Sequence, residues 1–492
     1  MRPLLSPLEM QEVDRMAQQD VGLPAAVLME NAGRTAWSWL ERSELMIARQ
    51  KTRILILAGG GNNGGDALVI ARYASAHPGV RLQVLITSGK MKELPTLQAQ
   101  ILRKMNIPVS TWKPGVLLNR ADLVIDGILG VGFTGNLSSE YLQLFDQVEN
   151  LGGVRVALDL PSGMSTSDGP VLSADYTLSL GYPKNLLFYP RNRRLAGKIV
   201  DLDIGIPPHL GNQSRYRGAM LEPKDLGGLL RPLDPTVYKN QRGHVAVVGG
   251  SLGTTGAPIL SCKAAAAARA GLVTLFTPPD VYPIAAGHLV SQMVRPFHGA
   301  SFDWSMYQSV VIGPGGAKDP EALDFLKTAL TKSVPLVLDA AALDLLGMIL
   351  KESPDISLRN AVLTPHIGEF SRLTGVAVAQ LNQDPLEEVL KAAKKWETWI
   401  VLKGSTVLVV SPEGEYWICD GYNPALATAG SGDVLSGILG ALLTTSADRE
   451  SAVLGAVVLH QQAGSRAWET HGWFNAEQLP DAVALLLKDP GQ

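Results

Sequence analysis

Cysteine is almost absent from this chain, which has just Cys262 and Cys419 among 492 residues. Two such distant cysteines build neither a disulfide framework nor a cysteine-based zinc site, and they suit a reducing compartment. An excess of charge of one sign is also missing, because 43 Lys and Arg stand against 46 Asp and Glu. The net charge of −3 comes without any run of basic residues, so we expect no nucleic-acid partner.

Long hydrophobic runs are missing as well. No apolar stretch reaches the roughly 18 residues that cross a bilayer, and residues 1–9 become polar too early for a signal peptide. We therefore expect a soluble, cytoplasmic protein without membrane contact. The hydrophobic residues, 46% of the chain, are spread over many short runs. A chain of this length exceeds one ordinary core, so two or three domains are expected.

Short apolar runs that end near Gly or Asp recur in the first half of the sequence, each followed by a helical pattern. They are residues 53–58, 82–86, 123–126 and 154–159. Near-continuous Val, Ile and Leu runs are typical of strands that are buried on both faces of a parallel sheet. Helical segments between them, such as 96–105, complete βαβ units and predict an α/β fold.

The pattern restarts after residues 207–235, which are rich in Pro, Gly and polar residues. The second series of apolar runs comprises residues 244–250, 272–276, 310–313, 334–339, 361–364 and 399–403, followed by a hairpin over 406–410 and 416–419. The two series are not close internal repeats. We predict two α/β domains, residues 1–215 and 225–492.

The first half holds a glycine-rich loop that carries an aspartate, residues 59–66, between the strand 53–58 and a helical stretch. Such a turn exposes backbone N–H groups at a helix N-terminus, where phosphate binds. The spacing is not G-x-G-x-x-G, and a purely structural turn accounts for this loop equally well when it is taken alone.

Two further loops of this kind, residues 126–136 and 159–163, follow other strands of the first series. Ligands bind outside the carboxyl ends of strands in open parallel sheets, so the three loops can converge on one site. Their Asn, Asp and Ser oxygens suit a monovalent cation. A solvated turn remains an equal alternative for each aspartate considered singly.

Residues 1 to about 210 resemble the YjeF N-terminal domain, the NAD(P)H-hydrate epimerase family. The resemblance covers residues 12–15, 28–33, 61–66, the Asp126 loop, 159–163 and 198–208. It implies a Rossmann-like three-layer αβα fold and interconversion of the R and S forms of hydrated NADH and NADPH. The family usually continues the Asp66 position with Gly, whereas this chain has Ala67, which is tolerated if the backbone there is helical.

The resemblance also implies roles for particular residues. Asp159 would be the acid/base, and Asn63, Asp126 and Ser162 would bind K⁺. Substrate contacts are implied for Asn62, Asn63, Gly64, Gly65, Asp66, Gly130, Val131, Gly132, Phe133, Thr134, Gly135 and Asn136.

The second half holds its own glycine-rich loop with an aspartate, residues 429–433, before the apolar helical run 434–443. Free N–H groups and the dipole at such a helix start favour a phosphate. Asp433 could take a proton from a substrate hydroxyl beside a phosphoryl group, or it could merely cap the helix. Lys403 and His366 follow other strands of this series, where a lysine can hold nucleotide phosphates.

Residues from about 225 to 490 resemble the ADP-dependent NAD(P)H-hydrate dehydratase family, which has a ribokinase-like αβα fold. The resemblance covers residues 242–251, 268–273, 313–315, 364–366, 403–405 and 430–433. It implies dehydration of the S form to NAD(P)H at the expense of ADP, with AMP and phosphate as products and Mg²⁺ accompanying the nucleotide. Asp433 would be the base. Substrate contacts are implied for Ala257, Gly315 and His366, and ADP contacts for Lys403, Gly404, Ser405, Thr406, Val407 and Gly432.

Two departures from the dehydratase pattern stand at Ala317 and Ala341, where the family usually has Gly and Asp. We expect the whole protein to form a homo-oligomer. Two alternatives stay open: the second half could be an ordinary small-molecule kinase of the ribokinase group, and the first half a non-catalytic binding module.

Overall fold

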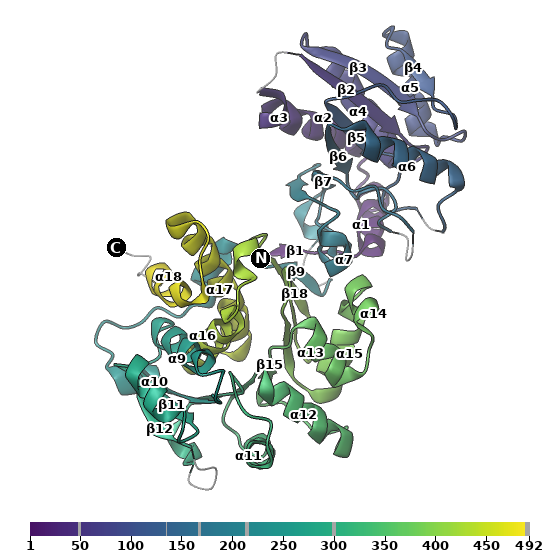
Figure 1. Ribbon diagram of the computed structural model, residues 1–492. Coiled ribbons are helices and arrows are strands. Elements are labelled where there is room, and N and C mark those ends of the chain that lie inside the picture. Colours follow the sequence, from purple (N-terminus) through teal and green to yellow (C-terminus); the bar gives the residue numbers. More distant parts are fainter. Residues whose placement is uncertain (48–50, 134, 166–168, 212–215, 298–301, 488–492) are drawn as a thin grey trace. The chain divides into compact units, whose positions relative to one another are not determined.

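The computed structural model describes residues 1–47, 51–133, 135–165, 169–211, 216–297 and 302–487 (Figure 1). The chain forms two compact units, Pro3–Gly218 and Ala219–Gln492, and the first two residues belong to the second unit. The division falls inside the polar break at residues 207–235. Both units are α/β, as the two series of apolar runs predict.

The first unit is built on a seven-stranded sheet in which every neighbouring pair is parallel. Its strands, in spatial order, are β4 (Val109–Thr111), β3 (Val80–Ile86), β2 (Thr52–Ala58), β5 (Leu123–Gly127), β6 (Val154–Leu158), β7 (Tyr176–Leu180) and β8 (Lys198–Leu202). The order reverses between β2 and β5. In open parallel sheets this reversal opens a crevice at the carboxyl edge, where ligands bind.

Helices cover both faces of this sheet. They are α1 (Pro7–Gln19), α2 (Ala25–Arg42), α3 (Glu44–Ile47), α4 (Asn62–Ser75), α5 (Glu93–Lys104), α6 (Ser139–Leu151) and α7 (Pro190–Arg193). Strand β2 shows why both faces are covered: Ile54 and Ile56 pack with α1, α2 and α4, whereas Leu55 and Leu57 pack with α6. This alternation makes the predicted three-layer αβα arrangement.

The second unit is built on an eleven-stranded sheet. Its strands, in spatial order, are β1 (Arg2–Pro3), β9 (Gly218–Met220), β18 (Tyr416–Asp420), β17 (Thr406–Val410), β16 (Trp399–Leu402), β15 (Ala361–Leu363), β14 (Leu336–Leu338), β13 (Ser309–Ile312), β10 (His244–Val248), β11 (Leu272–Thr277) and β12 (Met293–Pro296). Pairing is parallel from β12 to β16 and antiparallel through β17 and β18, which form the predicted hairpin.

The helices of the second unit lie on both sides of its sheet (Figure 1). They are α8 (Leu226–Leu229), α9 (Gly256–Ala267), α10 (Tyr282–His288), α11 (Pro320–Leu330), α12 (Ala341–Glu352), α13 (Ile367–Thr374), α14 (Val378–Gln383), α15 (Leu386–Trp396), α16 (Ser431–Thr445), α17 (Arg449–His471) and α18 (Leu479–Leu486). Helices α9 and α16 are in close contact at Gly437, where an added Cβ would lie 2.1 Å from the carbonyl oxygen of Ser261. A side chain has no room at that crossing.

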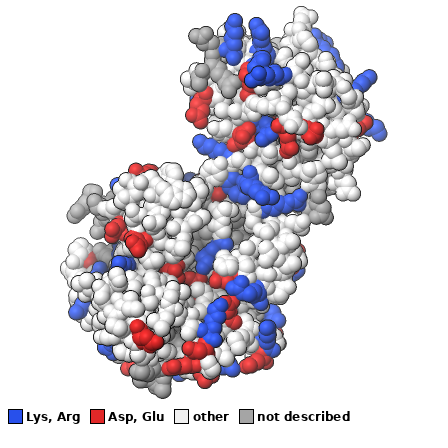
Figure 2. Space-filling view, in the orientation of Figure 1, with Lys and Arg blue, Asp and Glu red and all other residues white. Residues whose placement is uncertain are grey.

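The surface agrees with the balanced composition. Basic and acidic side chains are interspersed over the face shown in Figure 2, without a large area of one sign. Within the ranges given above, no helix combines the length and the apolar character that a membrane span requires.

Replacing Gly437 by Ala should destabilise the second unit. The new methyl group would collide with the Ser261 carbonyl, and overpacking of this kind costs about 1 to 3 kcal/mol. Gly287→Ala is the matched control, because this helical glycine has open space around its Cβ position and an alanine there favours the helix. Differential scanning calorimetry should show a lower unfolding temperature for G437A and no such decrease for G287A. Equal unfolding temperatures for the two variants would contradict the close α9–α16 contact.

Candidate active sites

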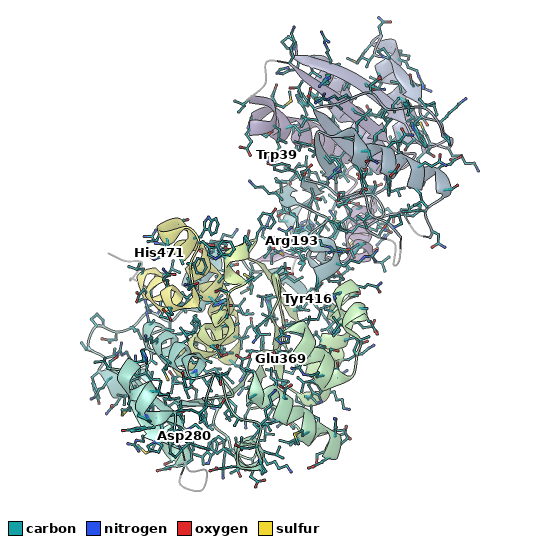
Figure 3. All side chains as sticks on the ribbon, viewed as in Figure 1. Trp39, Arg193, Asp280, Glu369, Tyr416 and His471 are labelled. Carbon is teal, nitrogen blue, oxygen red and sulfur yellow. The ribbon has the colours of Figure 1, made fainter. Side chains whose placement is uncertain are left out.

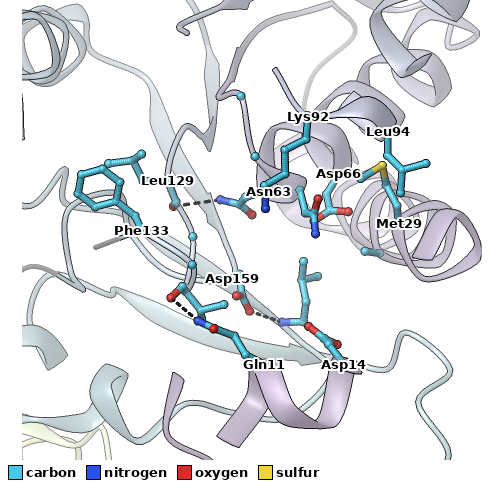
Figure 4. A pocket seen from close by; sticks show the side chains of 18 of the residues that line it. Gln11, Asp14, Met29, Asn63, Asp66, Lys92, Leu94, Leu129, Phe133 and Asp159 are labelled. Atoms are coloured by element: carbon cyan, nitrogen blue, oxygen red, sulfur yellow. Dashed lines mark hydrogen bonds between the residues drawn. The ribbon is translucent and has the colours of Figure 1, made fainter. Parts of the chain in front are cut away.

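A cavity of about 720 Å³ opens at the carboxyl edge of the first sheet (Figure 4). Its lining comes from the turns after β2, β5 and β6, from α1 and α2, and from the segment after β7. Predicted residues on this lining are Asn62, Asn63, Asp66, Gly130, Val131, Gly132, Phe133 and Asp159. The three aspartate-bearing loops therefore meet at one place.

Close backbone contacts explain the glycines of the first loop. An added Cβ at Gly59 would lie 1.8 Å from the carbonyl oxygen of Ile128, and one at Gly64 would lie 2.0 Å from the Gly59 oxygen. Gly64 and Gly65 are buried in the first turn of α4, where they pack against Gly59 and Met29 instead of joining the described lining. Gly65 and Gly64 thus shape the loop that presents Asn62 and Asn63.

Three other predicted residues are not among those that line the cavity in the described part of the chain. Gly135 and Asn136 continue the loop beyond the described lining, and Thr134 lies outside the described residues. Ala67 is fully buried in helical backbone, so it carries no strain. Its methyl group faces Gly127, where an added Cβ would lie 2.5 Å away, and this glycine makes room for the departure.

Oxygen atoms converge where the turns after β2, β5 and β6 meet. The Ser162 hydroxyl donates to Asp126 Oδ1 at 2.5 Å and its N–H donates to Oδ2 at 2.9 Å, while the Leu129 N–H donates to Ser162 Oγ at 2.9 Å. Asn63 Nδ2 donates to the Leu129 oxygen at 3.1 Å. The Oδ1 atom of Asn63 is buried and has no hydrogen-bond partner among the described residues.

This oxygen cluster fits a weakly held hard cation. Burial raises the pKa of Asp126 to about 6, against the hydrogen bonds from Ser162 and Ile128 that lower it. A buried carbonyl-type oxygen without a donor is a costly feature that a cation would satisfy. Over the described ranges, no group of three or more His, Cys, Asp or Glu side chains could hold a metal, so the cluster offers mainly neutral oxygens.

Asp159 stands in the turn after β6 with φ of +64°, a left-handed conformation that is strained for a side-chain-bearing residue. Lys184, fully buried, forms an ion pair with Asp159 Oδ1 and donates to the Leu180 oxygen at 2.6 Å. The Leu180 N–H also donates to Asp159 Oδ1, at 3.3 Å. Lys184 was not foreseen from the sequence, because a single lysine after an apolar strand has no distinctive spacing.

Two more carboxyl groups share this cavity. Asp66 is buried in α4, and its pKa is raised well above the usual value by burial and then by the charges of Asp159 and Asp14. Asp14 projects from α1, and burial, followed by the charge of Asp159, raises its pKa to about 6, although Lys184 opposes the shift. The role of Asp14 was not foreseen from the sequence.

In the second unit, a charged cluster forms around the start of α16. Lys403 donates to Asp339 Oδ1 at 2.6 Å, and Ser436 donates to the other oxygen of this buried carboxylate. Asp433 lies in the first turn of α16, and its pKa is raised to about 7 by burial, then by the charges of Asp339 and Glu369, while Lys403 lowers it. Asp433 is therefore poised to exchange a proton near neutral pH.

The predicted nucleotide contacts lie beside this cluster. An added Cβ at Gly432 would lie 3.2 Å from Lys403 Nζ, so the α16 start and the β16 end are adjacent. Gly404 and Ser405 are exposed between β16 and β17. Thr406 and Val407 are buried in β17, and the Val407 side chain belongs to the core.

Ala257 and Gly315 are also close to one another. An added Cβ at Gly315 would lie 3.1 Å from the Ala257 Cβ, and the Thr254 hydroxyl donates to the Gly315 oxygen at 2.7 Å. Ala317 and Ala341, the two departures, line a separate, mostly apolar cavity of about 160 Å³ with Phe276 and Phe325. The departures therefore shape a neighbouring pocket instead of the Asp433 cluster.

His366 caps α13. Its Nδ1 accepts from the N–H groups of Gly368 at 3.0 Å and Glu369 at 3.2 Å, and Glu369 Oε2 accepts from the His366 N–H at 2.8 Å. The side chain is half-exposed, and its Nε2 lies 3.5 Å from Glu369 Oε1. Glu369 (Figure 3) is a buried acidic neighbour of Lys403 and Asp433 that the sequence analysis did not single out.

His460 of α17 contacts the backbone at the start of α16. Its Nε2 lies 2.9 Å from the Ser431 carbonyl oxygen, and burial lowers the pKa of this imidazole to about 4. The ring is therefore neutral at physiological pH and can donate Nε2–H to the carbonyl. A lone histidine in an apolar helix gives no sign of this contact in the sequence.

Comparisons with known proteins agree for both units. The family model described as YjeF-related protein N-terminus matches residues 25–186, and the model described as NAD(P)H-hydrate dehydratase matches residues 245–484. A ribokinase-like superfamily protein from Enterococcus faecalis has a similar structure, with a TM-score of 0.50 and 26% identity over 55% of this chain and 95% of that chain. The predicted ribokinase-like fold of the second unit is confirmed.

Full-length relatives carry both units. The bifunctional NAD(P)H-hydrate repair enzyme Nnr of Moorella thermoacetica is 32% identical and is matched over 99% of this chain and 97% of its own length. The protein of the same description from Gloeobacter violaceus is 34% identical over 94% of each chain. This chain belongs to the family of bifunctional NAD(P)H-hydrate repair enzymes.

Proposed function

We propose that the first unit interconverts the R and S forms of hydrated NADH and NADPH, and that the second unit dehydrates the S form with ADP, giving AMP and phosphate. The observation that carries the proposal is that each unit holds its own aspartate at the carboxyl edge of its sheet, beside a lysine that is fully buried in the first unit and partly buried in the second. Two separate acid/base centres match two separate reactions.

The first cavity suits a dinucleotide. The start of α4 offers free N–H groups at Gly61 and Asn62. Lys90 and Lys92 also line the cavity. A diphosphate would therefore meet positive charge there. Asp159 would then lie at the ring. The hydroxyl of the hydrate is on a carbon beside the ring nitrogen, whose lone pair helps to expel it when a carboxyl group supplies the proton.

K⁺ is the cation that we assign to the oxygen cluster of Asn63, Asp126 and Ser162. The unpartnered Asn63 oxygen and the chemistry of the donor set support this assignment. A bound K⁺ would supply positive charge beside the substrate. The Leu129 backbone, which Asn63 and Ser162 contact, connects the cluster to the Gly130–Phe133 lining of the cavity.

In the second unit, Asp433 would take the proton of the ring hydroxyl, and the resulting oxygen would attack the terminal phosphoryl group of ADP. The carbon–oxygen bond of this phosphate ester would then break and release phosphate, a neighbouring ring proton would be lost, and the nicotinamide ring would be restored. Phosphate is a far better leaving group than hydroxide, which explains why a nucleotide is needed. Lys403 and the N–H groups at the start of α16 would hold the phosphates.

Mg²⁺ would accompany the nucleotide and neutralise phosphate charge. Mg²⁺ is usually bound by one or two carboxylates plus substrate phosphates, so the described residues need not supply a dedicated acidic cage. No observation favours the two alternatives considered earlier, an ordinary kinase and a non-catalytic module. The strained, lysine-paired Asp159 in a large cavity supports catalysis in the first unit.

We further infer that the protein is a cytoplasmic homo-oligomer. Cys262 and Cys419 are both buried and unpaired, which suits a reducing compartment. Trp468 and Trp473 are 44% and 68% exposed, and aromatic side chains of this kind are typical of subunit contacts.

Asp159→Asn should remove epimerisation and leave dehydration intact. Loss of a positioned acid/base lowers the rate by about 100-fold or more, so a mixture of both hydrates with ADP should lose its S form rapidly and its R form at the spontaneous rate. The recovery of NADH absorbance measures this. Asp146→Asn, an exposed carboxylate on α6, is the matched control. Rapid and complete recovery of NADH absorbance with D159N would show that Asp159 is not the acid/base.

Ser162→Ala should weaken the response of epimerisation to K⁺. This change removes the hydroxyl that joins Asp126 to the Leu129 backbone, so more K⁺ should be needed for half-maximal activation. A titration with KCl at constant ionic strength, balanced with tetramethylammonium chloride, measures the shift. Ser75→Ala, on the exposed end of α4, should titrate like the wild type. An unchanged K⁺ response in S162A would argue against the assigned site.

The dehydration rate should rise with pH as Asp433 loses its proton. The base is active as a carboxylate, and its pKa of about 7 in the ligand-free protein predicts that kcat/KM increases up to that pH and is level above it. Asp433→Asn should abolish this activity at every pH and leave epimerisation unchanged. The control is Asp481→Asn, an exposed aspartate in the first turn of α18. A rate that falls over the same pH range would exclude Asp433 as the base.

A further inference from the structure

Helix α1 carries the acidic side chain of Asp14 into the first cavity, and the proposed function assigns no role to this side chain. Gln11, Asp14 and Gln18 line the cavity, and their spacing of three and four residues places them on one helix face. Met10, Val13, Met16 and Ala17 are buried and belong to the core, and Met10 also lines the cavity.

The position of α1 is well fixed. A capping box starts the helix: the Ser6 side chain accepts from the Glu9 N–H at 3.2 Å, and Glu9 Oε2 accepts from the Ser6 N–H at 2.6 Å. One turn before Asp14, Gln11 Nε2 donates to the Val131 oxygen at 3.0 Å, which ties the helix to the substrate loop. Asp14 is thus held at the cavity wall.

Three carboxyl groups face this cavity, and they differ in their surroundings (Figure 4). Asp159 extends from the sheet edge and is paired with Lys184. Asp66 is 8% exposed, and burial, followed by the charges of Asp159 and Asp14, raises its pKa well above the usual value. Asp14 comes from α1, is more open to the cavity, and has a pKa of about 6, so it can both give and take a proton near neutrality.

The stereochemistry of the reaction favours groups on two sides of the ring. When the ring nitrogen expels the hydroxyl, inversion at that carbon means that oxygen leaves from one face and that oxygen is delivered to the other. A single carboxyl group fixed beside one face can transfer protons efficiently on that face alone, because proton transfer needs hydrogen-bond distance. An epimerase that uses general acid–base catalysis therefore benefits from a second group on a different wall.

We propose that Asp14 is a second catalytic residue of the first unit, which exchanges protons with the hydroxyl on the ring face opposite to Asp159. The inference rests on the proposed epimerase function. It replaces a single shuttling carboxylate by two groups from different elements, α1 and the turn after β6.

In one direction, Asp14 gives its proton to the ring hydroxyl. The carbon–oxygen bond breaks, water leaves, and the nitrogen lone pair forms a carbon–nitrogen double bond. Asp159, as the carboxylate, takes a proton from water on the other face, whose oxygen bonds to the carbon while the double-bond electrons return to nitrogen. The opposite inversion uses Asp159 as the acid and Asp14 as the base. A water relay returns the proton before the next turnover in the same direction.

Asp14→Asn tests this assignment in the full-length protein without ADP, with separated R and S hydrates in H₂¹⁸O. The wild type should place a solvent oxygen on the ring with each inversion. D14N should invert about 100-fold more slowly or worse. It should still exchange the hydroxyl oxygen of one form without inversion, because Asp159 can act alone on its own face. Chromatography of the two forms with mass spectrometry measures inversion and exchange together.

Matched variants separate catalysis from folding. Asp20→Asn makes the same change at the exposed end of α1 and should behave like the wild type. Asp14→Glu retains a carboxyl group and should recover most of the inversion. D14N should bind NADP⁺ like the wild type.

Two results would overturn the proposal: D14N that inverts at the wild-type rate, or D14N that binds NADP⁺ but loses inversion and oxygen exchange together. Failure of D14E to recover inversion would also overturn it. A wild-type protein that inverts neither form would instead refute the epimerase function itself.

Discussion

A parallel strand delivers its carboxyl end to the same edge of the sheet as its neighbours, and both units depend on this constraint. In the first unit it brings the turns after β2, β5 and β6 together, where the order of strands reverses. The turns can approach so closely because Gly59 and Gly64 leave no side chain between backbone atoms. The cation-type oxygen cluster and the cavity are both consequences of that approach.

The two units use aspartate and lysine differently at this edge. In the first, Lys184 pairs directly with Asp159, the proposed acid/base. In the second, Lys403 pairs with Asp339, while Asp433 remains free of that ion pair and has its pKa raised to about 7. A group that must take a proton beside a phosphoryl donor benefits from this separation, because Lys403 can face the nucleotide. The similar glycine-rich loops therefore support different chemistry.

Much of this architecture was predictable from local patterns. The apolar runs predicted a contiguous set of strands in each sheet, but not β4, β7 and β8 of the first sheet or β1, β9 and β12 of the second. The turns after those runs supplied the predicted part of the cavity lining, since a strand end determines where the next turn lies. Asp14, Lys184, Glu369 and His460 were not foreseen as site residues. Asp14 lies in the segment 12–15 that carries part of the resemblance, but a residue on a helix gives no local sign of the cavity that it faces. Tertiary packing, which has no short-range signal, sets their places. Gly64 and Gly65 illustrate the converse: they belong to the motif but serve its backbone geometry.

The central claim is that one chain carries out both steps of the repair. The most direct measurement supplies the purified protein with the R form of hydrated NADH alone, together with ADP and Mg²⁺ in a potassium buffer. The account predicts complete recovery of NADH absorbance with one AMP and one phosphate released per NADH, because the R form must first become the S form. No recovery above the spontaneous rate, or a stable phosphorylated nucleotide as product, would contradict it.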